Sequence, residues 1–178
     1  MRREGFPFWR FSLRTYRRQG VAPACLALQD ECGADVNVLL YCCWMGSQGK
    51  CLDRRAVRSA MAAVGRWQDE VVRPLRRARR AIRKDPSGST AEQAKALRQH
   101  LAAAELDAEY LEQQLLAAEA SRTLLAVGSD APRAAAANNL SRYVEALGAA
   151  PGSRQARNLR VLADAVGART VTLDRTPR

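Results

Sequence analysis

A row of basic side chains points most directly to a binding chemistry in this sequence. Side chains spaced three or four residues apart lie on one face of a helix, and this row lies away from the apolar residues Val71, Leu75 and Ile82. Guanidinium groups bind carboxylates and phosphates through paired hydrogen bonds. The sequence therefore predicts a surface for an anionic partner, made of Arg73, Arg76, Arg77, Arg80, Arg83 and Lys84, here called the arginine row.

Whether this row is free depends on the acidic residues of the helix that follows it. If the two helices form an antiparallel hairpin that turns just after the row, Glu105, Glu109 and Glu112 face residues 63–70. Glu92 is then the only acidic residue opposite the row. We therefore expect the row to be largely unneutralised within the hairpin. The alternative is a solvated face neutralised by its neighbours.

A second group of polar residues surrounds a predicted turn near the N-terminal end: Gln29, Asp30, Asp35 and Asn37. Asn37 lies beside an apolar stripe that includes Leu40 and Trp44, so its amide must find hydrogen-bond partners in a half-buried place. One interpretation is a polar network that ties the first three helices together through Arg10 or Arg14. The other is a pocket for a ligand or a partner.

The remaining residues of catalytic type form no known arrangement. His100 is the single histidine and has no serine or cysteine at an informative spacing. The segment from Gly46 to Cys51 lacks the Gly-Lys-Ser/Thr ending of a phosphate-binding loop. We expect no catalytic residue, no metal and no cofactor. An enzyme with an unrecognised site among the first three helices remains an alternative.

The cysteines are odd in number and contain no Cys-x-x-Cys pair: Cys25, Cys32, Cys42, Cys43 and Cys51. This pattern is typical of reduced thiols rather than a disulfide framework. Buried cysteines behave as small apolar residues. Because Cys42 and Cys43 are adjacent on a helix, about 100° apart, at most one of them is expected to face the core.

Three short helices are predicted before residue 50. Trp9, Leu13 and Tyr16 share one face of a helix over residues 7–18. A second helix contains Pro23 in its first turn and stops at Gly33, and Asp35 is the predicted N-cap of a third. Seven of the ten aromatic residues precede residue 45. These helices therefore predict an aromatic-rich head, in which Trp9, Leu40 and Trp44 are core residues.

A long helical hairpin is predicted after the head. Asp53 is the expected N-cap of a segment over residues 54–84, which Pro74 should kink or split, and Leu75 is expected in its core. A turn over residues 85–88 and a capping box at Ser89 begin the next helix. Its apolar residues follow a heptad pattern that predicts a seam, formed by Leu97, Leu101, Ala104, Ala108, Leu111, Leu115 and Ala118. The same pattern would also allow two copies of the chain to pair.

Two shorter helices, over residues 132–147 and 154–166, are predicted at the C-terminal end. We expect residues 1–128 to form one all-α domain. Residues 129–178 form a helical extension that either packs on the hairpin or extends from it loosely.

Composition supports the all-α class and excludes several others. The chain has 33 alanines and one isoleucine, which favours helices over strands. Its longest apolar run, residues 38–45, is far too short to span a membrane. The N-terminal residues show no secretion signal, so a cytoplasmic protein is expected. The net charge of +11 comes mostly from arginine, which also suits a GC-rich genome.

The N-terminal residues also resemble a known group of proteins. The segments Phe8-Trp9-Arg10-Phe11-Ser12-Leu13 and Asp35-Val36-Asn37, followed by Leu39-Leu40, are similar to an uncharacterised proteobacterial family with a domain of unknown function. A second block around Trp67 and Pro74-Leu75-Arg76 fits the same family, and the resemblance covers residues 6–125. It implies a small bacterial cytosolic helical protein, and it brings no activity or cofactor.

The sequence therefore predicts a non-catalytic binding or adaptor protein. The expected partner is anionic and binds the arginine row. It is either an acidic protein or a nucleic acid, such as the RNA of the ribosome, whose phosphates attract arginine side chains.

Overall fold

The computed structural model describes residues 5–82, 91–122, 131–149 and 152–167. The described residues are helical, as predicted, and contain no strand. The elements in chain order are α1 (Pro7–Tyr16), α2 (Val21–Cys32), α3 (Val36–Ser47), α4 (Arg54–Trp67), the π-helical turn η2 (Gln68–Val72), α5 (Arg73–Ile82), α6 (Ala91–Arg122), α7 (Pro132–Ala146) and α8 (Ser153–Gly167). The predicted domain boundary at residue 128, the turn at 85–88 and Ser89 lie outside the described residues.

Two predicted N-caps set the starts of α3 and α4. The Asp35 carboxylate accepts a hydrogen bond from the Asn37 backbone N–H at 2.8 Å, and Asp53 accepts one from the Ala56 N–H at 2.7 Å. Such caps satisfy N–H groups that have no partner inside the helix. Both predictions are confirmed.

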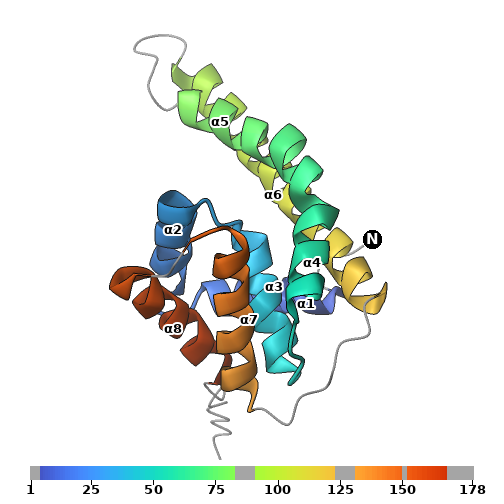
Figure 1. Cartoon of the computed structure of the whole chain (residues 1–178). Helices are drawn as coiled ribbons and strands as arrows, with labels where there is room; N and C mark the ends of the chain where they lie inside the picture. The colour runs from blue at the N-terminus through green and yellow to red at the C-terminus, as the bar shows by residue number, and fades with distance from the viewer. Residues whose placement is uncertain (1–4, 83–90, 123–130, 150–151, 168–178) are drawn as a thin grey trace, which may run out of the picture.

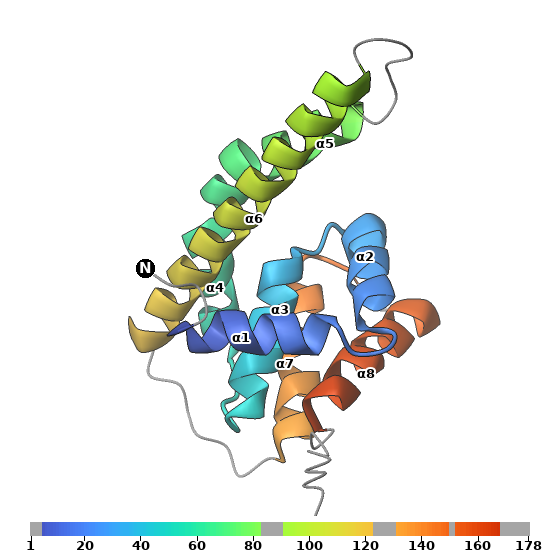
Figure 2. The same cartoon turned by 180° about the vertical axis from the view of Figure 1, so that it is seen from behind.

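The helices form a head and a projecting hairpin. Helices α1, α2 and α3 make the head, and α4, η2 and α5 pack antiparallel to α6 (Figure 1). The tip of this hairpin, where α5 ends and α6 begins, extends beyond the other helices in both views (Figure 2), whereas the first turn of α5 contacts α2 through Arg76. No residue of α5 is buried, so Leu75 is only half-buried, contrary to its predicted core position.

The aromatic head is confirmed, with one change. Phe8 stacks on Trp44, with ring centroids 4.7 Å apart, and Trp9 meets Tyr110 of α6 edge to face. Trp9 and Leu40 are buried as predicted. Trp44, contrary to its predicted core position, is only half-buried and packs against the edge of the core.

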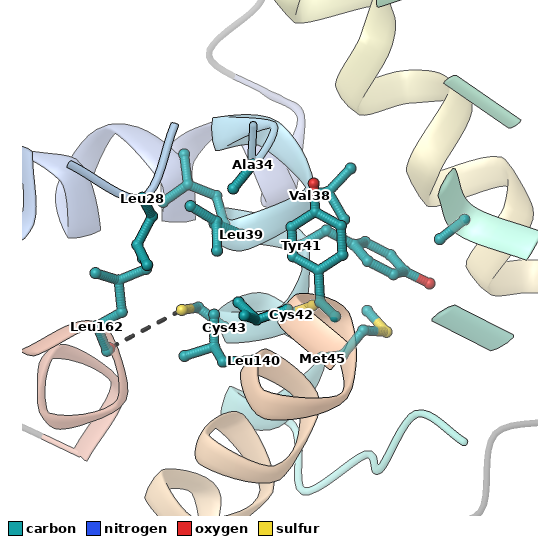
Figure 3. Packing of buried hydrophobic residues seen from close by; sticks show 14 of the residues in the cluster. Leu28, Ala34, Val38, Leu39, Tyr41, Cys42, Cys43, Met45, Leu140 and Leu162 are labelled. Atoms are coloured by element: carbon teal, nitrogen blue, oxygen red, sulfur yellow. Dashed lines mark hydrogen bonds between the residues drawn. The ribbon is translucent and has the colours of Figure 1, made fainter. Parts of the chain in front are cut away.

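Helices α7 and α8 pack on the head rather than on the far half of the hairpin. They bury Leu140, Tyr143 and Leu162 against α3 and α2 (Figure 3). Because α1 and α6 cover one side of α3 and α7 and α8 the other, both Cys42 and Cys43 are buried. The prediction that only one of them faces the core is therefore wrong.

An asparagine fixes α7 to the head and to the segment that follows α3. The fully buried Asn139 side chain donates hydrogen bonds to the carbonyl oxygens of Cys42 and Lys50, and it accepts one from the Leu52 N–H at 2.7 Å. Nearby, Gly46 lies against the backbone of Ala136, with no side chain between α3 and α7. The two helices therefore approach each other very closely.

The predicted heptad seam of α6 is wrong at most positions. Ala108 is buried, but Leu97, Leu111 and Leu115 are 52%, 45% and 41% exposed. The buried face lies about one residue further along the helix and consists of Glu105, Ala108, Glu112, Gln113 and Leu116, with Tyr110 beside it. The face is rotated because α6 packs on the head as well as on α4 and α5.

Candidate functional site

Helix α5 places part of the arginine row on one side of the hairpin. Arg73, Arg77 and Arg80 are exposed there, and Arg76 is half-buried. Arg83 and Lys84 lie outside the described residues.

Arg76 is neutralised by α6, contrary to the prediction that only Glu92 faces the row. Its Nε donates to Glu105 at 2.8 Å, and its two terminal nitrogens donate to Glu109 and to Gln29, each at 2.7 Å. Arg79 also pairs with Glu105. Glu105 and Glu109 therefore face α5 rather than residues 63–70.

Two features explain this shift of register. The π-helical turn η2 advances less per residue than an α-helix, so every residue of α5 lies closer to α4 than an unbroken α-helix would place it. In addition, long helical side chains slope toward the N-terminal end of their own helix. Both effects move the guanidinium groups toward higher-numbered residues of the antiparallel α6.

The row therefore divides into two parts. Arg76 belongs to a partly buried ion-pair cluster. Arg73 pairs with Asp69 one turn away on the exposed surface, an interaction that contributes little to stability. Among the described residues, no carboxylate lies within ion-pair distance of Arg77 or Arg80. In the described part of the row, Arg77 and Arg80 are therefore the guanidinium groups that no carboxylate neutralises.

Two of the four predicted polar residues, Asn37 and Asp35, take part in buried hydrogen bonds, and Gln29 accepts one from Arg76 in the partly buried cluster. Asn37 donates to Glu112 Oε2 at 2.7 Å and accepts from the Gln113 amide at 2.8 Å, and Gln113 accepts from the Ser12 hydroxyl. Asp35 caps α3, while its own backbone N–H donates to the Tyr143 hydroxyl at 2.8 Å.

The two other parts of the polar prediction differ from the structure. Asp30 is exposed on α2 and takes no part in this network. The partners of Asn37 come from α6, whereas Arg10 and Arg14 are exposed on α1. The proposed link through these two arginines is therefore wrong. Helix α6 replaces it, because its polar face turns toward α3.

Glu112 is fully buried in this network and is protonated at neutral pH. Burial, together with the charge and a side-chain hydrogen bond of Asp35, raises the pKa of Glu112 far above its usual range, to about 10. Its Oε1 accepts no hydrogen bond from the described residues. A proton on this carboxyl group, donated to Asp35, satisfies both acids with one shared hydrogen.

The pKa values of the two carboxyl groups beside Arg76 are shifted in opposite directions. Burial acts to raise the pKa of Glu105, but the hydrogen bonds and charges of Arg79 and Arg76 outweigh it and hold that pKa below its usual value. Burial raises the pKa of Glu109, which Arg76 opposes only in part. The ion pairs of Arg76 thus join α5 to α6 within the hairpin, and its hydrogen bond to Gln29 joins the hairpin to the head.

Two hollows flank the arginines of α5. The first, here called the apolar cleft, has a volume of about 280 Å³ and lies between the head and the hairpin. Leu13, Leu26 and Leu106, all exposed large apolar side chains, line it together with Arg80. The second, here called the polar hollow, has a volume of about 240 Å³ and lies between α5 and the turn from α2 to α3. Arg73, Arg77, Arg80 and Gln68 line it.

A family model matches residues 7–116, which include the head, the arginine row and the buried carboxyl groups of α6. Its description is a protein of unknown function, DUF2390. The chain belongs to the DUF2390 family. No curated protein and no solved structure matches it.

The DUF2390 match covers the candidate site but not all of the helices that pack against the head. Both hollows are lined by residues of the matched segment, whereas α7 and α8, which cover α3, lie beyond it. Among the described helices, none combines the length and apolar character needed to cross a membrane.

The described residues contain no group of three or more His, Cys, Asp or Glu side chains placed so that they could hold a metal ion. His100 is exposed on α6 and lines neither the apolar cleft nor the polar hollow.

Sequence reasoning missed Glu112 and Gln113 as parts of the site. The available signal was the spacing of Glu105, Glu109 and Glu112, which places three carboxyl groups on one face of α6. These carboxyl groups were expected opposite residues 63–70, and the heptad pattern of leucines indicated a different buried side of α6.

The five thiols should differ in reactivity toward an alkylating reagent. We expect fast labelling of the half-buried Cys32 and Cys51 and slow labelling of Cys25, Cys42 and Cys43. Burial raises the pKa of Cys25 to about 12 and also raises the pKa values of Cys42 and Cys43 well above their usual range, so little reactive thiolate forms. Mass spectrometry of peptides after a timed reaction measures the order, and unfolded protein is the control. Fast labelling of Cys42 or Cys43 would contradict the packing of α7 and α8 on α3.

Proposed function

We propose that this chain is a non-catalytic binding or adaptor protein that engages an acidic segment of another protein through α5. The observation that supports this most directly is the pair Arg77 and Arg80, which are exposed and have no carboxylate within ion-pair distance among the described residues. The neighbouring Arg76 and Arg79 already pair with carboxylates of α6, which supports a carboxylate as the ligand of Arg77 and Arg80.

The surroundings of Arg80 favour a protein partner over a nucleic acid. Arg80 lines the apolar cleft together with Leu13, Leu26 and Leu106, so an acidic segment with apolar side chains finds both kinds of contact there. Single-stranded nucleic acids bind through stacking on exposed aromatic side chains. All ten aromatic residues of this chain are described, and every one is buried or half-buried.

The proposal includes a bacterial, cytoplasmic setting. Its support is the alanine- and arginine-rich composition and the odd number of cysteines, which contain no Cys-x-x-Cys pair.

The test compares two double charge reversals with the same spacing. Arg77→Glu with Arg80→Glu should weaken binding of a fluorescent peptide of glutamate and leucine residues at least tenfold, measured by anisotropy. The control is Arg157→Glu with Arg160→Glu on the exposed face of α8, which should change the affinity less than twofold. Arg76 is kept, because its loss would remove the ion-pair partner of Glu109 and leave Glu105 paired with Arg79 alone.

A random-sequence RNA of 20 nucleotides serves as the second probe in the same titrations. We expect it to bind more weakly than the peptide at physiological salt. Equal affinities of the two variants for the peptide would overturn the proposal. Tighter binding of the RNA, with an affinity that falls steeply as salt rises, would replace the protein partner by a nucleic acid.

A further inference from the structure

The polar hollow contains a buried hydrogen-bond acceptor without a donor. Gln68 begins the π-helical turn η2 and is only 7% exposed, and it lines the polar hollow. Its side-chain oxygen Oε1 accepts no hydrogen bond from any described residue. Leaving a buried amide oxygen unsatisfied costs about 1–3 kcal/mol. A native structure therefore needs a reason to hold it there.

The π-helical turn is what directs Gln68 into this position. In η2 the Arg73 backbone N–H bonds to the Gln68 carbonyl, five residues back, so the turn contains one more residue than an α-helical turn. Pro74 follows directly and cannot donate to the carbonyl four residues before it. Such turns occur frequently at functional sites.

The charged side chains around the polar hollow indicate which charge a ligand must carry in addition to a hydrogen-bond donor for Gln68. Arg77 and Arg80 offer guanidinium groups without a carboxylate within ion-pair distance in the described part of the chain. Asp35 lines the same hollow, and its negative charge disfavours a doubly charged anion such as a phosphate monoester. A singly charged carboxylate fits this balance better.

We propose that the polar hollow binds a carboxylate that has an amide N–H close to it, with the carboxylate on Arg77 and Arg80 and the N–H donated to Gln68 Oε1. Either the C-terminal residue of a peptide or an internal aspartate or glutamate outside a helix presents this combination. Inside a helix the backbone N–H is already bonded. This inference rests on the proposed function and specifies the conformation of the acidic segment.

The test uses two pairs of small probes in which an ester oxygen replaces the amide N–H. N-acetylglycine and acetoxyacetate represent a C-terminal carboxylate. N-acetylaspartate α-methylamide and the corresponding malate ester represent an internal acidic residue. Each pair has the same charge, so only the hydrogen bond to Gln68 differs. Titrations of the full-length, ¹⁵N-labelled protein are followed by NMR at the side-chain amide signal of Gln68.

For at least one pair, the amide probe should bind at least fivefold more tightly than its ester and shift the Gln68 signal. The tighter pair then identifies the source of the carboxylate. In Gln68→Met, which keeps the length of the side chain and removes the acceptor, the ratio should fall to about one. Gln19→Met, an exposed substitution of the same kind, should leave the ratio unchanged.

Equal binding of amide and ester in both pairs, or a ratio that survives in Gln68→Met, would overturn this inference. The charge reversal at Arg77 and Arg80 distinguishes this failure from failure of the proposed function. If that reversal still weakens binding of the acidic peptide while amide and ester probes bind equally, the adaptor proposal stands and the proposed hydrogen bond to Gln68 is wrong. If the reversal has no effect, both fall.

Discussion

Gly46→Ala should lower the free energy of unfolding by roughly 3 kcal/mol, at the upper end of the usual cost of overpacking. A Cβ atom at Gly46 would lie 2.4 Å from both the Cα and the backbone nitrogen of Ala136. These are main-chain atoms, so no side-chain rotation relieves the contact, and α3 and α7 must move apart. Denaturant unfolding followed by circular dichroism measures the loss.

Gly65→Ala is the matched control. Gly65 lies inside α4, and a Cβ there would meet nothing within 4 Å. Since glycine is a poor helix former, this alanine should raise stability by about 0.5–1 kcal/mol. If Gly46→Ala were as stable as the unmodified protein while Gly65→Ala behaved as expected, the close packing of α7 on α3 would be contradicted.

Glu112→Gln should make stability less dependent on pH. In the folded state the raised pKa of Glu112 keeps its carboxyl group protonated, whereas in the unfolded chain it ionises above its ordinary pKa near 4.3. The folded state therefore binds one more proton, and stability is lost as pH rises from that value toward about 10. The slope contributed is up to about 1.4 kcal/mol per pH unit.

Glutamine removes this slope and keeps a donor for Asp35. Unfolding curves at pH 5, 6.5 and 8 should therefore show the advantage of Glu112→Gln over the unmodified protein growing with pH. Glu145→Gln on the exposed side of α7 is the control, and its curve should stay parallel to that of the unmodified protein. A constant difference between Glu112→Gln and the unmodified protein would show that Glu112 is ionised in the folded state.

Local signals in the sequence predicted the helices well. Asp35 and Asp53 combine an N-cap residue with a following apolar period, and both act as caps. The apolar and aromatic residues of the head likewise identify part of its core, since burial of Trp9 and Leu40 depends on patterns within single helices. These features are encoded over a few residues and do not depend on the arrangement of distant helices.

The contacts between helices could not be predicted in the same way. The heptad of leucines gave the wrong buried face for α6, because carboxyl groups can be buried when Arg76 or Asn37 supplies hydrogen bonds. The predicted register of the hairpin placed Glu105 away from the arginine row. The π-helical turn shifts that register and brings Arg76 beside Glu105. Neither effect is visible in the periodicity of one helix.

The candidate site was predicted only in outline. The exposure of Arg77 and Arg80 and the burial of Asn37 follow from their positions on helix faces. The place of Gln68 in the polar hollow depends on the π-helical turn η2 and on the turn from α2 to α3, which lies opposite. Neither feature is visible in the periodicity of a single sequence.

The position of α7 has a consequence for synthesis of the chain on the ribosome. Asn139 bonds to the carbonyl of Cys42 across 97 residues of sequence, and Leu140 and Tyr143 cover the same side of α3. At 5–20 residues per second, α3 emerges roughly 5–20 s before its cover is made. During that interval the nascent DUF2390 segment presents an apolar helix face to its surroundings, so the chain must be shielded while it grows or fold only after α7 has emerged.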